Sequence, residues 1–213
     1  MQLDALIPSA PELLKYDVHH RQKSQEIRHI QAMTKPLIAL DCDGVLLDYN
    51  LAYAKAWLRF TGVYPAESDP QAYWPMDRWD VQQLVGDQLA MFRAAFDTEF
   101  WSSIPPIAGA VEACHQLHDH GYQLVCVTAL DDRFVRARLK NLRDLGFPIE
   151  KIFGVSHQVG PKSPKADIIE NIQPVAFVDD FLPYLAGIRS ETHTALILRG
   201  PNGSPNWVPA WRK

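Results

Sequence analysis

The chain has 213 residues, 47% of them hydrophobic, which suffices for one core with an insertion but hardly for two large domains. A formal charge of −4, without a dense run of Lys and Arg, excludes a nucleic acid polymer as an expected partner. No stretch approaches the roughly 18 to 20 apolar residues that span a bilayer, so we expect no membrane association. The chain has an odd number of cysteines, and no two of them have a CxxC spacing: Cys42, Cys114 and Cys126. This predicts reduced thiols in a cytoplasmic protein.

Residues 1–35 join a short apolar patch to a polar, histidine-rich run. They lack the charged start, apolar centre and cleavage site of a secretory signal. We expect a loosely attached N-terminal extension or a short helix. Met33 lies just before the first expected strand, and the sequence leaves open whether translation starts at Met1 or at Met33.

Five short apolar runs are predicted to be strands: Leu37–Leu40, Leu124–Val127, Ile152–Val155, Val175–Val178 and Ala195–Leu198. Helical patterns lie between the later runs, at Val111–His118, Phe134–Leu145, Asp167–Ile172 and Leu182–Ile188. This alternation predicts an α/β fold with a doubly wound, five-stranded parallel sheet, built from residues 36–47 and 106–213. Right-handed crossovers would bring the carboxyl ends of all five strands to one edge.

The segment 48–105 is far longer than one crossover helix needs, and it is rich in aromatic residues. Helical periodicity recurs within it, whereas an uninterrupted loop of this length would be unusual. We therefore predict a small helical cap inserted after the first strand. Its aromatic residues are expected to form a small core, with one or two lining the substrate pocket: Trp57, Tyr73, Trp74, Trp79, Phe96, Phe100 and Trp101.

Two aspartates end the first strand in the sequence LIALDCDGVL, residues 37–46. Asp41 lies at the carboxyl end of the strand and Asp43 on the loop beyond it, at the edge where open parallel sheets bind ligands. Crowded carboxylates repel each other unless a proton or a cation offsets their charge, so this pair predicts a divalent metal. The same residue types also occur in ordinary turns after strands, and further motifs have to separate the two interpretations.

Three such motifs follow in order along the chain. LVCVTAL ends a strand at Thr128, GPKSPKADII puts Lys162 and Lys165 before a helix, and VAFVDD ends in Asp179 and Asp180. Together with the first motif they resemble the four motifs of the haloacid dehalogenase (HAD) superfamily. The resemblance implies the Rossmann-like core of that superfamily.

The resemblance also implies catalytic roles for the first two aspartates. Asp41 resembles the nucleophile that forms a phospho-aspartyl intermediate. Asp43 resembles the general acid/base that protonates the leaving group and then activates water. Gly44, directly after Asp43, permits a tight turn.

The phosphate of the substrate would be bound by Thr128, by the neighbouring Ala129 and by a lysine. Lys165 is the preferred lysine, because Ser163 and Pro164 would begin a helix and place it in the first turn. Lys162 is the alternative.

Mg²⁺ is the implied cofactor. Its ligands would be Asp41, the backbone carbonyl of Asp43, and one of the two acids at the end of the fourth strand. Asp180 aligns better with the residue that binds Mg²⁺ directly in the superfamily, so Asp179 would bind the ion through a water molecule. The sequence leaves open which of the two aspartates is the direct ligand.

The resemblance also indicates the reaction, because dehalogenases and phosphonate-cleaving members of the superfamily typically lack an aspartate at the position of Asp43. It therefore implies phosphate ester chemistry, and the expected function is Mg²⁺-dependent hydrolysis of a small phosphorylated metabolite. The stretch FWSSIPPIAGAVEACHQL is similar to the corresponding region of deoxyribonucleotidase-like members, which suggests a nucleoside monophosphate. A phosphotransferase or mutase remains an alternative, as does a non-catalytic protein that binds a partner through its cap and tail. The oligomeric state is not predicted.

Overall fold

The computed structural model describes residues 35–206, so residues 1–34 and 207–213 lie outside the described range. The expected N-terminal extension, apart from Lys35, and the alternative start at Met33 therefore fall outside the described residues. Within 35–206, no helix combines the length and the apolar character needed to cross a bilayer.

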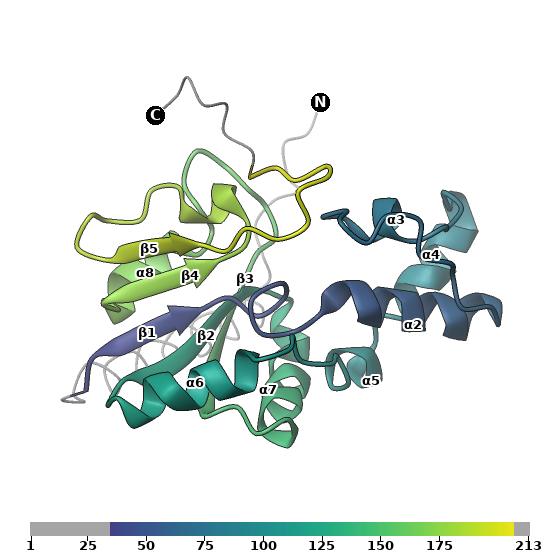
Figure 1. Ribbon diagram of the computed structural model, residues 1–213. Coiled ribbons are helices and arrows are strands. Elements are labelled where there is room, and N and C mark those ends of the chain that lie inside the picture. Colours follow the sequence, from purple (N-terminus) through teal and green to yellow (C-terminus); the bar gives the residue numbers. More distant parts are fainter. Residues whose placement is uncertain (1–34, 207–213) are drawn as a thin grey trace, which may run out of the picture. The chain divides into compact units, whose positions relative to one another are not determined.

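Five parallel strands form one sheet in the order β3-β2-β1-β4-β5 (Figure 1). The strands are β1 (Leu37–Leu40), β2 (Gln123–Ala129), β3 (Ile149–Val155), β4 (Ala176–Asp179) and β5 (His193–Leu196). All four residues of β1 are buried, as expected of a central strand that is covered on both faces. The predicted α/β fold with a five-stranded parallel sheet is confirmed.

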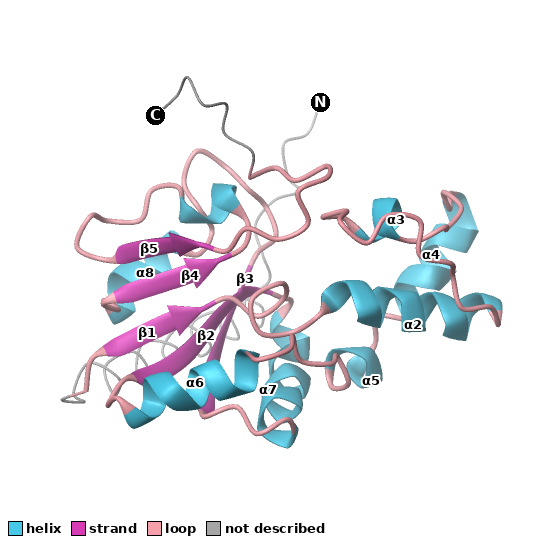
Figure 2. Cartoon of the chain, in the orientation of Figure 1, coloured by secondary structure: helices cyan, strands magenta, loops and turns pink. Residues whose placement is uncertain are grey.

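Helices cover both faces of this sheet. The first face carries α6 (Ala110–Asp119) and α7 (Val135–Asp144), which follows the 3-10 turn η1 (Asp132–Phe134), and α8 (Ala166–Ile172) leads from β3 to β4. The strand order reverses between β1 and β4, so right-handed crossovers place α8 on the face opposite to α6 and α7. Figure 2 shows α6 and α7 below the strands and α8 behind β4 and β5.

Two predicted elements near the C-terminal end of the sheet are wrong in detail. The helix expected at Leu182–Ile188 is only a 3-10 turn, η2 (Leu182–Leu185), and Gly187 with φ of 75° then turns the chain out of a helical path. The last strand begins and ends two residues earlier than Ala195–Leu198. It ends where β4 offers no further partner, since Asp179 pairs with Leu196, and Leu198 is 76% exposed.

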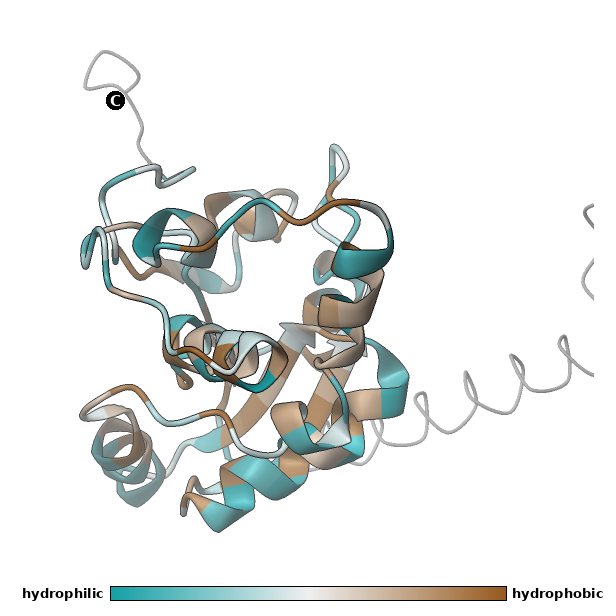
Figure 3. Cartoon of the chain, turned by 90° about the vertical axis from the view of Figure 1, so that its right-hand side faces the viewer, coloured by the Kyte–Doolittle hydropathy of each residue, from teal (hydrophilic) through white to brown (hydrophobic). Residues whose placement is uncertain are grey.

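The hydrophobic core lies between the sheet and its helices. Val125, Val127 and Phe177 are fully buried in the sheet, and Leu142 is fully buried on the inner face of α7. Figure 3 shows hydrophobic residues concentrated on the central strands, whereas the surrounding helices carry both kinds of residue. Burial of this kind provides the main favourable free energy of folding.

Four helices lie between β1 and α6: α2 (Tyr49–Thr61), α3 (Pro75–Arg78), α4 (Gly86–Ala94) and α5 (Thr98–Trp101). Asp48 begins α2, because its carboxylate accepts a hydrogen bond from the backbone N–H of Leu51 at 2.9 Å. We call residues 48–105 the insertion. Figure 1 shows its helices beyond the carboxyl ends of the strands.

Aromatic side chains hold the insertion together. The rings of Trp57 and Phe92 lie 5.4 Å apart, and those of Phe96 and Phe100 lie 4.6 Å apart, all edge to face. Trp79 donates its indole N–H to the carbonyl of Asn50 at 2.8 Å, which ties the loop after α3 to α2. Trp57, Phe92 and Phe100 belong to the same buried hydrophobic cluster as Ile38 and Leu40 of β1, so these aromatic residues extend the core of the sheet and do not form the separate small core that was expected.

Candidate active site

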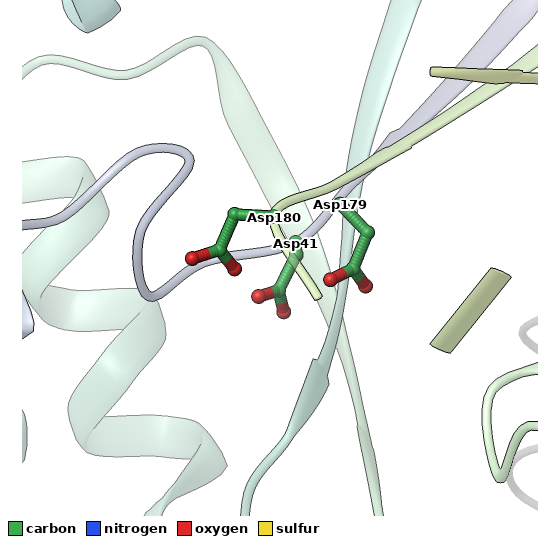
Figure 4. Close-up of side chains that lie close together, drawn as sticks. All are labelled: Asp41, Asp179 and Asp180. Atoms are coloured by element: carbon green, nitrogen blue, oxygen red, sulfur yellow. The ribbon is translucent and has the colours of Figure 1, made fainter. Parts of the chain in front are cut away.

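Three carboxylates meet where β1 and β4 end side by side. Asp41 follows β1, and its backbone N–H donates to the carbonyl of Val178 in β4 at 2.8 Å. Asp179 ends β4 and Asp180 follows it. Each of the three aspartates offers an oxygen within 4.8 Å of the others, and Figure 4 shows their carboxylates pointing to the same side. This is the crevice at the reversal of strand order, where open α/β sheets bind ligands.

Lys165 joins two of these carboxylates. Its ammonium donates to Asp41 Oδ1 at 2.7 Å and to Asp179 Oδ2 at 2.6 Å, and the lysine is fully buried. The helix α8 starts at Ala166, so Lys165 is its N-cap residue and does not lie in its first turn as expected. Ser163 still orders the segment, because its hydroxyl accepts from the backbone N–H of Lys165 at 3.1 Å.

Lys162, the alternative lysine, lies elsewhere. Half of its side chain is exposed, and its ammonium pairs with Asp167 at 2.5 Å and with Glu170 at 3.8 Å. Both partners belong to α8. The structure thus brings Lys165, and not Lys162, to the candidate nucleophile.

Burial sets the ionisation of this cluster. It raises the pKa of Asp180 to about 6, although the nearby Arg199 guanidinium opposes the rise. Burial also raises the pKa of Asp179, and the charge of Asp41 adds to that effect while Lys165 opposes it. For Lys165, burial alone would lower the pKa, but the carboxylates of Asp41 and Asp179 outweigh it and keep the ammonium charged.

Asp43 lies apart from the three carboxylates. Its two oxygens accept from Arg138, Oδ1 from Nη1 at 2.6 Å and Oδ2 from Nη2 at 3.2 Å. Arg138 was not among the residues predicted from the sequence. A usable signal existed, because Arg138 stands three residues after Val135 and four before Leu142, in phase with the apolar stripe of α7.

A pocket of about 390 Å³ opens above Asp41. Thr128 and Ala129, at the end of β2, line it together with Asp43 and Asp180. Much of the remaining wall is aromatic and comes from the insertion and from the segment after β4: Tyr49, Tyr73, Trp74, Trp101, Phe181 and Tyr184. Three of the aromatic residues singled out in the sequence reach the pocket, instead of one or two, because Tyr73, Trp74 and Trp101 all face the strand ends.

The last described segment, residues 199–206, forms what we call the C-terminal strap. Arg199 Nε donates to Asp180 Oδ2 at 2.5 Å, and its guanidinium lies 4.5 Å from the centre of the Tyr73 ring. Asn206 donates to the backbone carbonyl of Asp180 and accepts from the N–H of Leu182 at 2.7 Å. The strap therefore fixes Asp180 from two directions, and nothing in the sequence motifs pointed to it.

No protein-family model and no curated protein matches the sequence. Solved structures do resemble the chain. A hydrolase from Streptococcus pneumoniae TIGR4 is 14% identical, with a TM-score of 0.50 over 78% of this chain and 94% of that one. A HAD family hydrolase from Deinococcus radiodurans R1, with bound phosphate and sodium, is 14% identical, with a TM-score of 0.52 over 75% of this chain and 79% of that one.

A dehalogenase is also similar, at 14% identity and a TM-score of 0.51 over 81% of this chain and 88% of that one. These likenesses show that the chain has the fold of the HAD-superfamily hydrolases, and the resemblance inferred from the four motifs is confirmed at the level of the fold. Because hydrolases and a dehalogenase share this fold, the reaction has to be argued from the site.

Proposed function

We propose that the protein is a Mg²⁺-dependent phosphomonoesterase that acts on a small phosphorylated metabolite. The observation that carries this proposal is the contact between buried Asp41 and buried Lys165 at the floor of the pocket. A carboxylate attacks a phosphate dianion only where cations offset the charge of both groups, and Lys165 supplies one such cation.

Asp41 would be the nucleophile. Lys165 holds its Oδ1, so Oδ2 is the atom that attacks phosphorus and forms the phospho-aspartyl intermediate as the bond to the leaving group breaks. Thr128 and Ala129 lie at the end of the neighbouring strand, where they would hold the phosphoryl oxygens. Asp43 would carry the proton in both half-reactions.

The acidic cluster suits a magnesium ion. Oxygen ligands from carboxylates are what Mg²⁺ prefers, and within residues 35–206 the three buried carboxylates form ion pairs with two cations, Lys165 and Arg199. Both oxygens of Asp179 already accept hydrogen bonds, from Lys165 and from the N–H of Phe181, which favours Asp180 as the direct ligand. Asp41 and the backbone carbonyl of Asp43 would complete the protein ligands. Bound Mg²⁺ would supply positive charge next to the phosphate.

The pocket walls favour a substrate with a planar group. Trp74 lines the pocket and is 44% exposed. The ring of Phe181 packs edge to face against it, with the two ring centres 6.2 Å apart. An exposed aromatic surface of this kind suits a nucleobase better than a small sugar or glycolate. A nucleoside monophosphate is therefore the substrate class that we propose first.

The test is phosphate release from p-nitrophenyl phosphate, nucleoside monophosphates and sugar phosphates, with and without Mg²⁺. Asp41→Asn should abolish release, and Asp87→Asn, at an exposed position in α4, should not alter it. Absence of release from every substrate by the parent protein would overturn the enzyme proposal and favour a binding protein. Transfer of the phosphoryl group to an added alcohol or sugar instead of water would favour the phosphotransferase.

A further inference from the structure

Arg138 is a fully buried arginine that forms an ion pair with a carboxylate facing the pocket. It lies on the inner face of α7, and its guanidinium reaches Asp43, 95 residues earlier in the chain, through both Nη atoms. Asp43 keeps 24% of its side chain exposed and lines the pocket. The ion pair thus connects an immobilised cation in the core to a group that a substrate would meet.

Two further contacts fix the guanidinium in place. Its carbon lies 5.0 Å from the centre of the Trp101 ring, on α5 of the insertion, and Nη1 also donates to the Cys42 thiol at 3.2 Å. Among the described residues, Nε of Arg138 has no hydrogen-bond partner. The hydrogen bonds of the guanidinium therefore go from both Nη atoms to Asp43, and from Nη1 also to Cys42.

Stability alone does not account for this arrangement. Removing a guanidinium from water is costly, and an apolar side chain of similar volume often gives an equally stable core. Ala137 and Leu142, also on the inner face of α7, are apolar and buried. An arginine that leaves one of its own donors unpaired in the core is better explained by what it does to Asp43.

We infer that Arg138 is a positioning residue that orients the carboxylate of Asp43 to accept the proton of the water that hydrolyses the phospho-aspartyl intermediate. This inference rests on the function proposed above. Each carboxylate oxygen has two lone pairs, so Asp43 can accept from Arg138 and still accept a proton from water. The two parallel bonds restrict rotation of the carboxylate and so define the direction of its remaining lone pairs.

The step balances with groups already named. The water oxygen attacks phosphorus while its proton passes to Asp43. The bond between phosphorus and the Asp41 oxygen breaks, its electron pair returns to the Asp41 carboxylate, and inorganic phosphate leaves. The first step with p-nitrophenyl phosphate depends less on Asp43, because p-nitrophenolate leaves without needing a proton. Loss of Arg138 should therefore slow the second step more than the first.

Rapid mixing with p-nitrophenyl phosphate and Mg²⁺ separates the two steps. Arg138→Gln should keep a burst of about one p-nitrophenolate per active site, while the steady-state rate falls on the order of 10- to 100-fold, part of the usual contribution of a general base. Arg138→Lys, which keeps the charge but not the paired donors, should recover only part of the rate. Arg136→Gln, at an exposed position of the same helix, is the matched control and should behave as the parent.

A double-mutant cycle tests whether Arg138 acts through Asp43. If it does, Asp43→Asn combined with Arg138→Gln is no slower than Asp43→Asn alone, because the positioned group is already gone. Multiplied losses in the double variant, or a burst and a steady-state rate that fall in parallel, would overturn the inference in favour of a structural role. The burst amplitude counts folded sites, and Arg138→Met serves as the second variant if Arg138→Gln folds poorly.

The failures of the two proposals differ in this experiment. A parent protein without any phosphate release would remove the proposed function and the inference with it. A parent that releases phosphate through Asp41, combined with an Arg138→Gln variant that turns over at the parent rate, would leave the proposed function standing and remove Arg138 from it.

Discussion

The ammonium of Lys165 lies 2.7 Å from Asp41 Oδ1 although the two residues are 124 positions apart in the chain. The same ammonium contacts Asp179, so one buried cation serves the ends of two adjacent strands. Breaking such a pair by removing one partner leaves a buried charge unbalanced, which costs far more than loss of an exposed pair. The contact therefore predicts linked effects on stability and on activity.

Lys165→Gln should lower the free energy of unfolding by about 3 to 5 kcal/mol, because Asp41 and Asp179 lose their buried cation. It should also abolish phosphate release. Urea denaturation and an activity assay measure the two effects. Lys162→Gln is the matched control, and little change is expected because its ion pairs with α8 are exposed. The opposite ranking of the two variants would make Lys162 the functional lysine.

Gly44→Ala should weaken metal binding for a steric reason. Gly44 has φ of 84°, and a Cβ atom there would lie 2.1 Å from Asp180 Oδ2. Gly62→Ala isolates the conformational strain, since Gly62 has φ of 79° but nothing within 4 Å of a Cβ. Both variants should lose stability, whereas only Gly44→Ala should need more Mg²⁺ for half-maximal activity. An equal Mg²⁺ requirement in the two variants would contradict the assignment of Asp180 to the metal.

Most of the sheet could be predicted because its strands are short apolar runs with clear boundaries. The two wrong predictions concern the bounds of the last strand, which depend on pairing with β4, and the helix expected after β4, which depends on a single turn. The last strand ends at Leu196 because β4 ends at Asp179, a limit that the apolar run through Leu198 does not reveal. A helical turn begins at Leu182 after β4, with Pro183 as its second residue, but positive φ at Gly187 directs the chain away from a helix.

The candidate site was predictable to the extent that its residues follow strand ends. Asp41, Thr128 and Asp180 meet because parallel strands bring their carboxyl ends to one edge, which the motif order already implied. The two arginines follow from tertiary packing instead. Arg138 reaches the site from a helix face, and Arg199 from a segment beyond the last strand, so neither belongs to a local pattern of motif residues.

The Mg²⁺ effect on stability should depend on pH. The pKa of Asp180 in the folded protein is about 6, above that of an aspartate in the unfolded chain, so the folded state takes up the proton first as pH falls. Without metal, the buried charge of Asp180 lowers the free energy of unfolding above pH 6, and protonation of Asp180 removes this penalty as pH falls below 6. Mg²⁺ needs the charged form, so its stabilisation is present above pH 6 and is lost as pH falls through 6.

At a Mg²⁺ concentration a hundredfold above Kd, Tm should rise by roughly 5 to 10 °C at pH 8. The rise should largely disappear at pH 5, and thermal denaturation with and without Mg²⁺ at each pH measures it. Asp180→Asn should show little rise at either pH, and Asp87→Asn should behave as the parent. A rise of equal size at pH 5 and pH 8 would show that the metal does not compete with this proton.

The C-terminal strap should control the insertion wall of the pocket. Asn202 accepts from the N–H of Tyr73 at 2.9 Å and donates its own N–H to Gln71 at 3.1 Å, so the strap runs directly along the insertion. At Gly200, with φ of 50°, a Cβ would lie 2.9 Å from the carbonyl oxygen of Ala72 and from Tyr73 Cα, and backbone atoms cannot yield as a flexible side chain does.

Gly200→Ala should therefore push the strap away from Tyr73 and loosen the aromatic wall. On the proposed function this wall would contact the leaving group and not the phosphorus, so KM should rise severalfold while kcat changes less. Gly203→Ala is the control, since φ there is 69° but the nearest atom, Asp77 Oδ2, lies 3.4 Å from a Cβ. Steady-state kinetics at saturating Mg²⁺ compare the two variants. Equal increases in KM would mean that strain in the strap, and not its close packing on the insertion, determines the shape of the pocket.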